Sequence, residues 1–284
     1  MVERRAAGRL PDVARSGRSL GELAGRWTDL VLPRVCAGCA RPGAVLCRSC
    51  CALLTELHVA APRRHPPGFP PTVAAGVYAG PVRPAVVAFK ERGRAELAGP
   101  LGTALALAVA AVLAGAPPVP GPVLLVPVPS SAAAVRRRGR DHVRELAGQA
   151  ARTLRDAGLP AAVAPVLRRS RGTADSAGLD AGQRRANLAG RFRVSRSRAR
   201  WPVEARLVLV DDLVTSGATL TEAARALTAR GGTQGGAGPV LAAAVAATPR
   251  RPGPGTAAQA PPPLHGEAVT TFAVRPAPAR GSRR

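Results

Sequence analysis

Residues 207–220 read LVLVDDLVTSGATL, and this stretch decides the fold. Its first four residues are aliphatic without a polar break, which is typical of a central strand buried on both faces. Asp211 and Asp212 mark the point where the chain leaves the core, and the residues from Thr215 to Thr219 lead into a helix. A strand, loop and helix in this order predict an α/β fold, in which ligands sit at the carboxyl ends of parallel strands.

The loop TSGAT has the features of a phosphate site. Its three hydroxyls add hydrogen-bond donors, Gly217 lets the backbone come close to a ligand, and a helix N-terminus favours an anion. Two carboxylates would repel the same phosphate, so we expect them to face sugar hydroxyls or a cation. A ribose 5-phosphate satisfies both halves, with its vicinal hydroxyls on Asp211 and Asp212 and its phosphate in the loop.

Two other interpretations of this stretch are weaker. A hydrophobic strand that ends in Asp-Asp also occurs in ATPases, but these need a G-x4-G-K-[ST] loop. The single lysine of the chain, Lys90, lies in AFKERG without such a loop. A plain turn and helix cap would explain the threonines and the glycine but leaves two adjacent acids without a purpose.

All five cysteines fall within CAGCARPGAVLCRSCC. Four of them form two C-x2-C pairs separated by seven residues, which is the pattern of a closed tetrahedral zinc site. Two disulfides or a redox C-x-x-C pair are the alternative, but a chain without an export signal is expected in a reducing compartment. We therefore predict a structural Zn²⁺, with the fifth cysteine as a bystander. The predicted ligands are Cys36, Cys39, Cys47 and Cys50.

Charge and hydropathy narrow the class of protein. The formal net charge is +24, and nearly all of the positive charge is arginine. About half of this excess is attributed to codon bias and the rest to an affinity for polyanions such as phosphates. Residues 1–18 lack the apolar run of an export signal, and the apolar run 103–115 is too short to cross a bilayer. We expect a cytoplasmic protein without membrane insertion.

The order of segments predicts five parts. They are a disordered basic arm (1–18), a helix with the cysteine module (19–60), a Pro-rich linker (61–71), an α/β domain with a parallel twisted sheet (72–248) and a Pro/Ala/Arg-rich tail (249–284). Strands are expected at 72–80, 123–129, 162–168, 206–211 and 238–246, and helices at 81–114, 142–157 and 217–230. The Arg-rich segment 130–141 is expected as a loop.

These segments together resemble the ComF family, the competence-associated relatives of type I phosphoribosyltransferases. VLVDDLVTSGATL is similar to the motif with which those enzymes bind 5-phosphoribosyl-1-pyrophosphate (PRPP). The likeness runs from about Leu30 to Ala247 through the cysteine module, YAGPVRPAVVAFKERG, the VPVP strand, RRRGRDHVRELA, RRANLAGRF and the PRPP motif. The resemblance implies a phosphoribosyltransferase-like domain that uses PRPP and Mg²⁺ to transfer a phosphoribosyl group to an unidentified acceptor, with release of pyrophosphate.

The resemblance also implies roles for individual residues. The catalytic residues would be Asp211, Asp212 and Thr215, with the two acids on the ribose hydroxyls, directly or through Mg²⁺. The phosphate- and pyrophosphate-binding residues would be Ser216, Gly217, Ala218, Thr219, Lys90, Arg136, Arg137, Arg138 and Arg140. A flap over the site would include Arg184, Arg185 and Asn187.

The acceptor side departs from the family pattern. Many relatives have Gly-Phe-Asn-Gln where this chain has Gly139-Arg140-Asp141-His142, and no general base is evident, so His142 is one candidate. The alternative function is a non-catalytic competence adaptor that binds single-stranded DNA and keeps only a phosphoribosyl or nucleotide pocket. Four Phe, two Trp and one Tyr offer few platforms on which single-stranded bases could stack. The sequence leaves homo-oligomerisation open.

Overall fold

The structure is a computed structural model, and it describes residues 34–62, 66–169, 190–195, 202, 204–229 and 238–249. Several expected parts lie outside the described residues. They are the basic arm, the helix before the cysteines, the flap residues Arg184, Arg185 and Asn187, and the tail beyond residue 249.

Six strands form a central, mostly parallel sheet in the order β1-β2-β8-β7-β3-β4. The strands are β1 (His58–Val59), β2 (Thr72–Val77), β3 (Val123–Pro127), β4 (Ala161–Val163), β7 (Arg206–Val214) and β8 (Leu241–Ala247). Only β1 runs antiparallel to its neighbour within this described sheet. A separate antiparallel pair consists of β5 (Leu167–Arg169) and β6 (Phe192–Val194). The predicted α/β fold with a parallel sheet is confirmed.

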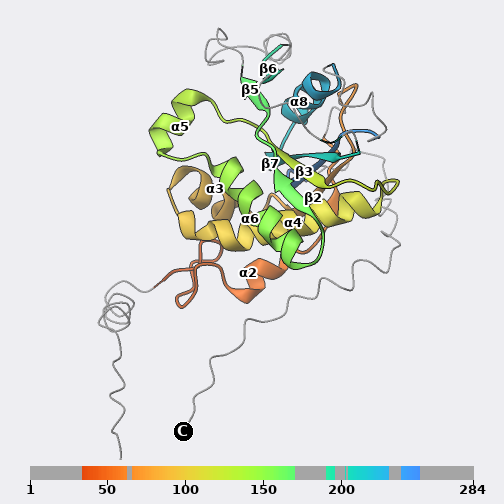
Figure 1. The fold of residues 1–284 in the computed structure, drawn as a ribbon. Coiled ribbons are helices and arrows are strands. Elements are labelled where there is room, and N and C mark those ends of the chain that lie inside the picture. Colours follow the sequence, from red (N-terminus) through yellow and green to blue (C-terminus); the bar gives the residue numbers. More distant parts are fainter. Residues whose placement is uncertain are drawn as a thin grey trace, which may run out of the picture.

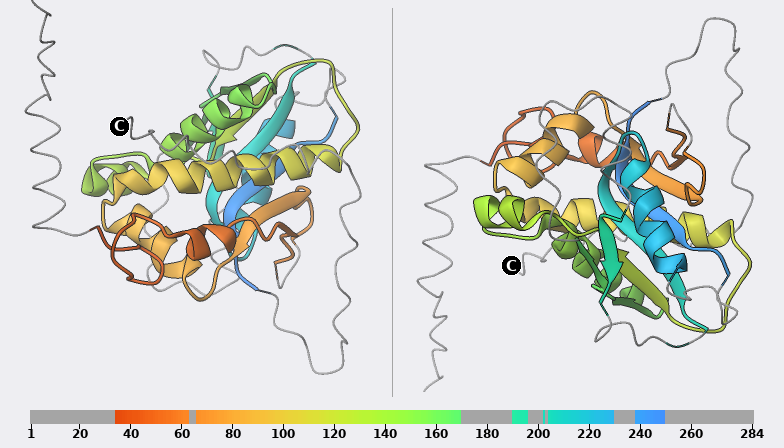
Figure 2. Two further views of the ribbon diagram at one scale, coloured as in Figure 1. Left: turned by 90° about the horizontal axis from the view of Figure 1, so that it is seen from below. Right: turned by 90° about the horizontal axis from the view of Figure 1, so that it is seen from above.

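Helices cover both faces of the sheet (Figures 1 and 2). One face carries α3 (Val82–Glu91), α4 (Ala98–Ala114) and α6 (His142–Asp156), and the other carries α8 (Ala218–Thr228). Alternate residues of β7 pack into two different hydrophobic clusters: Val208 and Val210 join α3, α4 and α6, whereas Leu207 and Leu209 join α8. Because side chains alternate along a strand, the next two residues of β7, Asp211 and Asp212, point to opposite faces of the sheet.

The apolar helix α4 forms the centre of the core. With the 3₁₀ turn η1 (Ala95–Leu97) it makes a helical run of 20 residues, Ala95–Ala114, which by length and composition alone is long and apolar enough to cross a membrane. The helix expected over 81–114 is divided into α3, η1 and α4, and the expectation that the apolar run is too short to cross a membrane considered residues 103–115 alone. Leu101, Leu105 and Val109 are buried against the sheet and α6, so packing in the core accounts for the apolar composition.

The Arg-rich segment expected as a loop contains a helix, α5 (Ala132–Arg138). The Ser131 hydroxyl caps its start by accepting a hydrogen bond from the Ala134 backbone N–H at 3.1 Å. Gly139 ends it in the left-handed conformation, with φ of 70°. Two other expectations were also inexact: β7 continues to Val214, and the strand expected at 162–168 is divided between β4 and β5.

The cysteine module packs directly on the α/β domain. Its short helix α2 (Arg48–Ala52) leads to Leu54, which is buried in the same cluster as α3 and α4. Gly76 in β2 allows this contact, because a Cβ there would lie 2.7 Å from the Leu53 carbonyl oxygen. Ala60 and Phe69, from either end of the expected linker region, join the cluster on the α8 face.

Candidate functional site

A cavity of about 370 Å³ lies at the carboxyl ends of β3 and β7. This is the edge of a parallel sheet where α/β proteins bind ligands. The elements that line it are α3, α5, α6, β5, β7, the start of α8, the loop after β3 and the loop between β7 and α8. The structure brings together seven of the residues singled out from the sequence: Lys90, Arg138, His142, Asp211, Asp212, Thr215 and Thr219.

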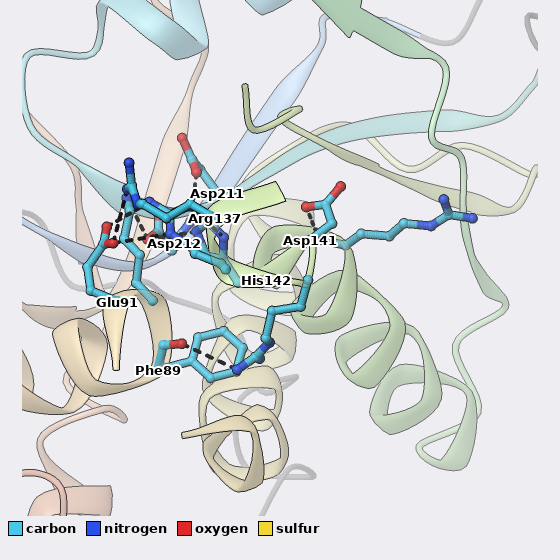
Figure 3. Close-up of polar contacts among 11 residues, drawn as sticks. Phe89, Glu91, Arg137, Asp141, His142, Asp211 and Asp212 are labelled. Carbon is cyan, nitrogen blue, oxygen red and sulfur yellow. Dashed lines mark hydrogen bonds and ion pairs between the residues drawn. The ribbon is translucent and has the colours of Figure 1, made fainter. Parts of the chain in front are cut away.

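Asp211 and Asp212 are both largely buried, with exposed fractions of 9% and 3%. By strand alternation, Asp211 is on the same face of β7 as Leu207 and Leu209, the face that packs on α8. Its Oδ1 accepts a hydrogen bond from the Asp212 backbone N–H at 2.9 Å. Asp212 points to the opposite face, where it contacts α3 and α6 (Figure 3). The two adjacent acids therefore have different surroundings, and they approach the cavity from different sides of one strand.

Asp212 forms a buried network with a lysine and a histidine. The Lys90 Nζ lies 2.9 Å from Asp212 Oδ2 and 3.3 Å from Oδ1. The His142 Nε2 lies 3.2 Å from the same Oδ2. His142 is the first residue of α6 and is 2% exposed, so its ring is held by packing as well as by hydrogen bonds.

These contacts separate the protonation behaviour of the two acids. Burial, together with the neighbouring Asp212, raises the pKa of Asp211 well above its usual value. Burial also opposes the charge on Asp212, but the His142 hydrogen bond and the Lys90 charge outweigh it and lower the pKa of Asp212. Burial likewise opposes the charge on Lys90, yet Asp212 raises the Lys90 pKa overall. An ionised Asp212 thus pairs with a charged Lys90, while Asp211 retains its proton more readily.

The arginines of α5 differ in their access to the cavity. Arg138 lines it, and its guanidinium binds the Glu91 carboxylate through two hydrogen bonds, Nη2 to Oε1 at 2.7 Å and Nε to Oε2 at 3.2 Å. Arg137 is 69% exposed and reaches Glu91 only at 3.5 Å. Arg136 is exposed and does not line the cavity. The sequence predicted all of these residues alike, but the helix presents them in different directions.

Arg140 points away from the cavity. It forms an ion pair with Glu145, in which Nε lies 3.0 Å from Oε1, and its guanidinium carbon stacks 4.3 Å from the centroid of the Phe89 ring. The left-handed turn at Gly139 separates Arg140 from α5 and sends it to this position. Its contacts join α3 to α6, and it is not among the residues that line the cavity.

The loop between β7 and α8 depends on a glycine. Gly217 has φ of 74°, and a Cβ at this position would lie 2.8 Å from the Phe69 ring and 3.0 Å from Pro62. The turn is therefore held tightly against the segment expected as a linker. Thr215 and Thr219 line the cavity on either side of this turn, at the N-terminus of an 11-residue helix. Ser216 and Gly217 form the turn itself and Ala218 begins α8; none of the three is among the residues that line the cavity.

The polar cavity residues that the sequence analysis did not single out come from two places. Ser130 and Ser131 lie in the loop after β3, and Arg169 enters from the end of β5. The Arg169 guanidinium carbon lies 5.9 Å from the centroid of the Phe192 ring, on the paired strand β6. A serine before a helix was a readable capping signal, but Arg169 is placed by the pairing of β5 with β6, which no local pattern revealed.

The four-cysteine cluster forms a second candidate site. The sulfur atoms all lie within 4.8 Å of one another, with Cys39 Sγ 3.6 Å from Cys47 Sγ. The Cys47 backbone N–H donates to Cys36 Sγ at 3.3 Å. Although burial opposes the charge, hydrogen bonds from backbone groups lower the pKa of Cys36 to about 6, whereas burial raises the pKa of Cys50. The cluster members are Cys36, Cys39, Cys47 and Cys50.

Two neighbouring residues show how tightly the cluster is built. A Cβ on Gly38 would lie 2.8 Å from Cys50 Sγ and 2.9 Å from the Pro81 carbonyl oxygen, so the first cysteine turn fits between α2 and the start of α3. Cys51 is outside the cluster, and its Sγ lies 3.7 Å from the Leu46 carbonyl oxygen. No disulfide joins any of the five cysteines, and the four clustered sulfurs could hold a metal ion.

No protein-family model matches the chain, and no curated protein matches it significantly. A function for this chain must therefore be inferred from the fold and from the geometry of the two sites.

Proposed function

We propose that this protein binds PRPP, or a related ribose phosphate, and acts as a phosphoribosyltransferase of the ComF kind. The observation that carries the proposal is one cavity that combines two acids with a phosphate-type loop and three cationic side chains. Asp211 and Asp212 lie near the carboxyl end of the central strand, Thr215 and Thr219 border the glycine turn, and Lys90 pairs with Asp212. Each part matches one portion of the ligand, because acids accept hydrogen bonds from sugar hydroxyls and a helix N-terminus favours the 5-phosphate.

The hydrogen bonds within the site leave acceptor capacity on each acid. A carboxylate has about four lone-pair positions. The bond from the Asp212 backbone uses Oδ1 of Asp211, and His142 and Lys90 together use Oδ2 of Asp212. Oδ2 of Asp211 and part of Oδ1 of Asp212 can therefore each accept one hydroxyl, which fits a vicinal diol.

Mg²⁺ fits the site only in part. It prefers oxygen ligands and commonly uses one or two carboxylates together with substrate phosphates. Asp212 is already paired with Lys90, which leaves Asp211 as the better protein ligand, and Asp211 would have to lose its proton. In our proposal Asp211 would hold a Mg²⁺ whose other ligands come mostly from the phosphates of PRPP, and the ion would supply charge neutralisation for the pyrophosphate group.

Arg138 and Lys90 are proposed to contact the pyrophosphate end of the ligand. Both line the cavity beside the loop after β3, and both are anchored, Arg138 by Glu91 and Lys90 by Asp212. Anchored cations lose little freedom when an anion binds, and they can stabilise the charge of a departing pyrophosphate. Holding PRPP at both ends would fix the reactive sugar carbon between them.

The cysteine cluster is proposed to hold a structural Zn²⁺. Zn–S bonds of about 2.3 Å in a tetrahedron place the sulfurs about 3.8 Å apart. The observed 3.6 Å between Cys39 and Cys47, within a cluster of 4.8 Å at most, fits this requirement. Four thiolates leave no position for a substrate, so the metal would stabilise the module against α3 in a reducing, cytoplasmic setting.

Consumption of PRPP separates the proposed enzyme from a binding protein. PRPP and Mg²⁺ would be incubated with the protein and a panel of nucleobases and amines, and ³¹P NMR would follow free pyrophosphate. The proposal predicts pyrophosphate release with at least one acceptor, and loss of release in Asp211→Asn. PRPP binding without release under any of these conditions would instead support the adaptor, whose DNA binding should then persist at moderate salt.

A further inference from the structure

His142 belongs to a closed chain of polar contacts that begins and ends on α3. Glu91 binds Arg138 through two hydrogen bonds, and Arg138 Nη1 lies 3.5 Å from His142 Nδ1. His142 Nε2 then contacts Asp212, and Asp212 returns to Lys90, the residue next to Glu91 (Figure 3). Four elements, α3, α5, α6 and β7, are joined by this one ring.

The ring favours one tautomer of His142. A guanidinium can only donate hydrogen bonds, so Nδ1, 3.5 Å from Arg138 Nη1, is suited to accept from it. In that tautomer Nε2 donates to Asp212 Oδ2. Both ring nitrogens then have protein partners, so the geometry argues against the general-base role considered from the sequence.

The ring also fixes the direction of the Asp212 carboxylate. His142 and Lys90 both contact Oδ2, at 3.2 and 2.9 Å, while Lys90 approaches Oδ1 at 3.3 Å. The His142 ring cannot follow a rotation of Asp212, because it is 2% exposed and packs edge-on to Phe89 with the ring centroids 6.2 Å apart. Rotation of the carboxylate would break its bond to His142, so Oδ2 stays fixed and Oδ1 keeps only the longer contact with Lys90.

We propose that His142 is a positioning residue that acts through Asp212: it orients Oδ1 to accept one specific hydroxyl of the bound ribose phosphate. This inference rests on the proposed function, and it assigns the two acids to different hydroxyls. Asp211 reaches its hydroxyl from the α8 face without help from the ring. His142 therefore sets sugar specificity while it contributes nothing directly to phosphate binding, which belongs to the loop before α8.

Calorimetric titrations with ribose 5-phosphate, 2-deoxyribose 5-phosphate and 3-deoxyribose 5-phosphate test this role. A hydroxyl bound to a charged acceptor contributes about tenfold in affinity, so the wild type should bind each deoxy sugar about tenfold more weakly than ribose 5-phosphate. His142→Phe keeps a flat ring at this position without its polar atoms. It should bind ribose 5-phosphate no more tightly than one of the two deoxy sugars, but still more tightly than the other. Asp211→Asn should show the reverse pattern for the two deoxy sugars.

The conservative variant His142→Gln distinguishes positioning from a general effect on folding. Its amide can donate to Asp212 and accept from Arg138, so it should restore the lost discrimination to within about twofold of the wild type. The inference is overturned if His142→Phe keeps both discriminations, or if it loses both while His142→Gln fails to restore them. If the wild type binds none of the three sugar phosphates, the proposed function fails as well, which separates the two failures.

Discussion

Lys90 and Asp212 are 122 residues apart in the chain, and their charged groups lie 2.9 Å apart at the floor of the cavity. The pair joins α3 to the central strand β7. Lys90 is the single lysine of an arginine-rich chain, and its ammonium group contacts both carboxylate oxygens of Asp212.

Replacing Lys90 by Met should destabilise the fold in a pH-dependent way. The variant leaves Asp212 buried without its counter-charge, which costs about 3 kcal/mol at pH 7. The folded pKa of Asp212 is lowered, so ionised Asp212 stabilises the protein above its unfolded pKa of about 4, and this contribution is lost as the pH falls through the folded pKa. Urea unfolding at pH 7 and pH 3 should therefore show a larger difference between variant and wild type at pH 7.

The control for this prediction is the double variant Lys90→Met/Asp212→Asn. It removes both charges together and should recover part of the lost stability at pH 7, because no unpaired charge remains buried. An equal loss of stability at both pH values would contradict the assigned ion pair.

Gly217→Ala should be more damaging than Gly139→Ala. Both glycines have a positive φ, of 74° and 70°, so each alanine pays about 1–2 kcal/mol of backbone strain. Only at Gly217 does the added Cβ also meet the Phe69 ring at 2.8 Å, whereas nothing lies within 4 Å of it at Gly139. We expect about 1 kcal/mol of further destabilisation at Gly217 together with weaker phosphate binding.

Thermal unfolding and phosphate titration of the two variants measure this difference. In a Phe69→Ala background, Gly217→Ala should cost less stability than it does in the wild type, because the clash with the ring is gone. Equal melting temperatures for the two single variants would show that the Phe69 contact does not constrain the loop.

Cys39→Ser should remove the metal, whereas Cys51→Ser should not. The sulfur of Cys39 belongs to the four-sulfur cluster, and that of Cys51 lies outside it. Elemental analysis of protein purified under reducing conditions should find one Zn²⁺ per wild-type chain and per Cys51→Ser chain. Chelation should lower the melting temperature of the wild type by at least about 5 °C, because metal binding is coupled to folding. Loss of metal from Cys51→Ser would disprove the assigned ligand set.

Local sequence patterns predicted the elements that depend on local chemistry. The aliphatic run before Asp211, the glycine turn before α8 and the C-x2-C pairs all specify their structure within a few residues. Two of these patterns are visible directly in the structure: Gly217 has the left-handed backbone conformation, and the four sulfurs lie together.

The features that the sequence analysis did not predict are of two kinds, one local and one dependent on contacts between distant segments. The Ser131 cap and the Gly139 ending are local signals that would have predicted α5, and with it the outward turn of Arg140. By contrast, the contact of His142 with Asp212 spans 70 residues and arises only when α6 packs on β7. The separation of the two acids onto different faces followed from strand alternation, but which helices they meet depends on the topology of the sheet.

The central claim is that the cavity at the end of β7 binds a ribose phosphate. Its most direct test is calorimetric titration of PRPP with Mg²⁺ into the wild type, Arg138→Gln and Arg140→Gln. These variants remove the same charge two positions apart, but only Arg138 lines the cavity. We predict binding by the wild type and Arg140→Gln, and at least about tenfold weaker binding by Arg138→Gln, in line with loss of a charged hydrogen bond. Absence of binding by the wild type, or equal weakening in both variants, would contradict the account.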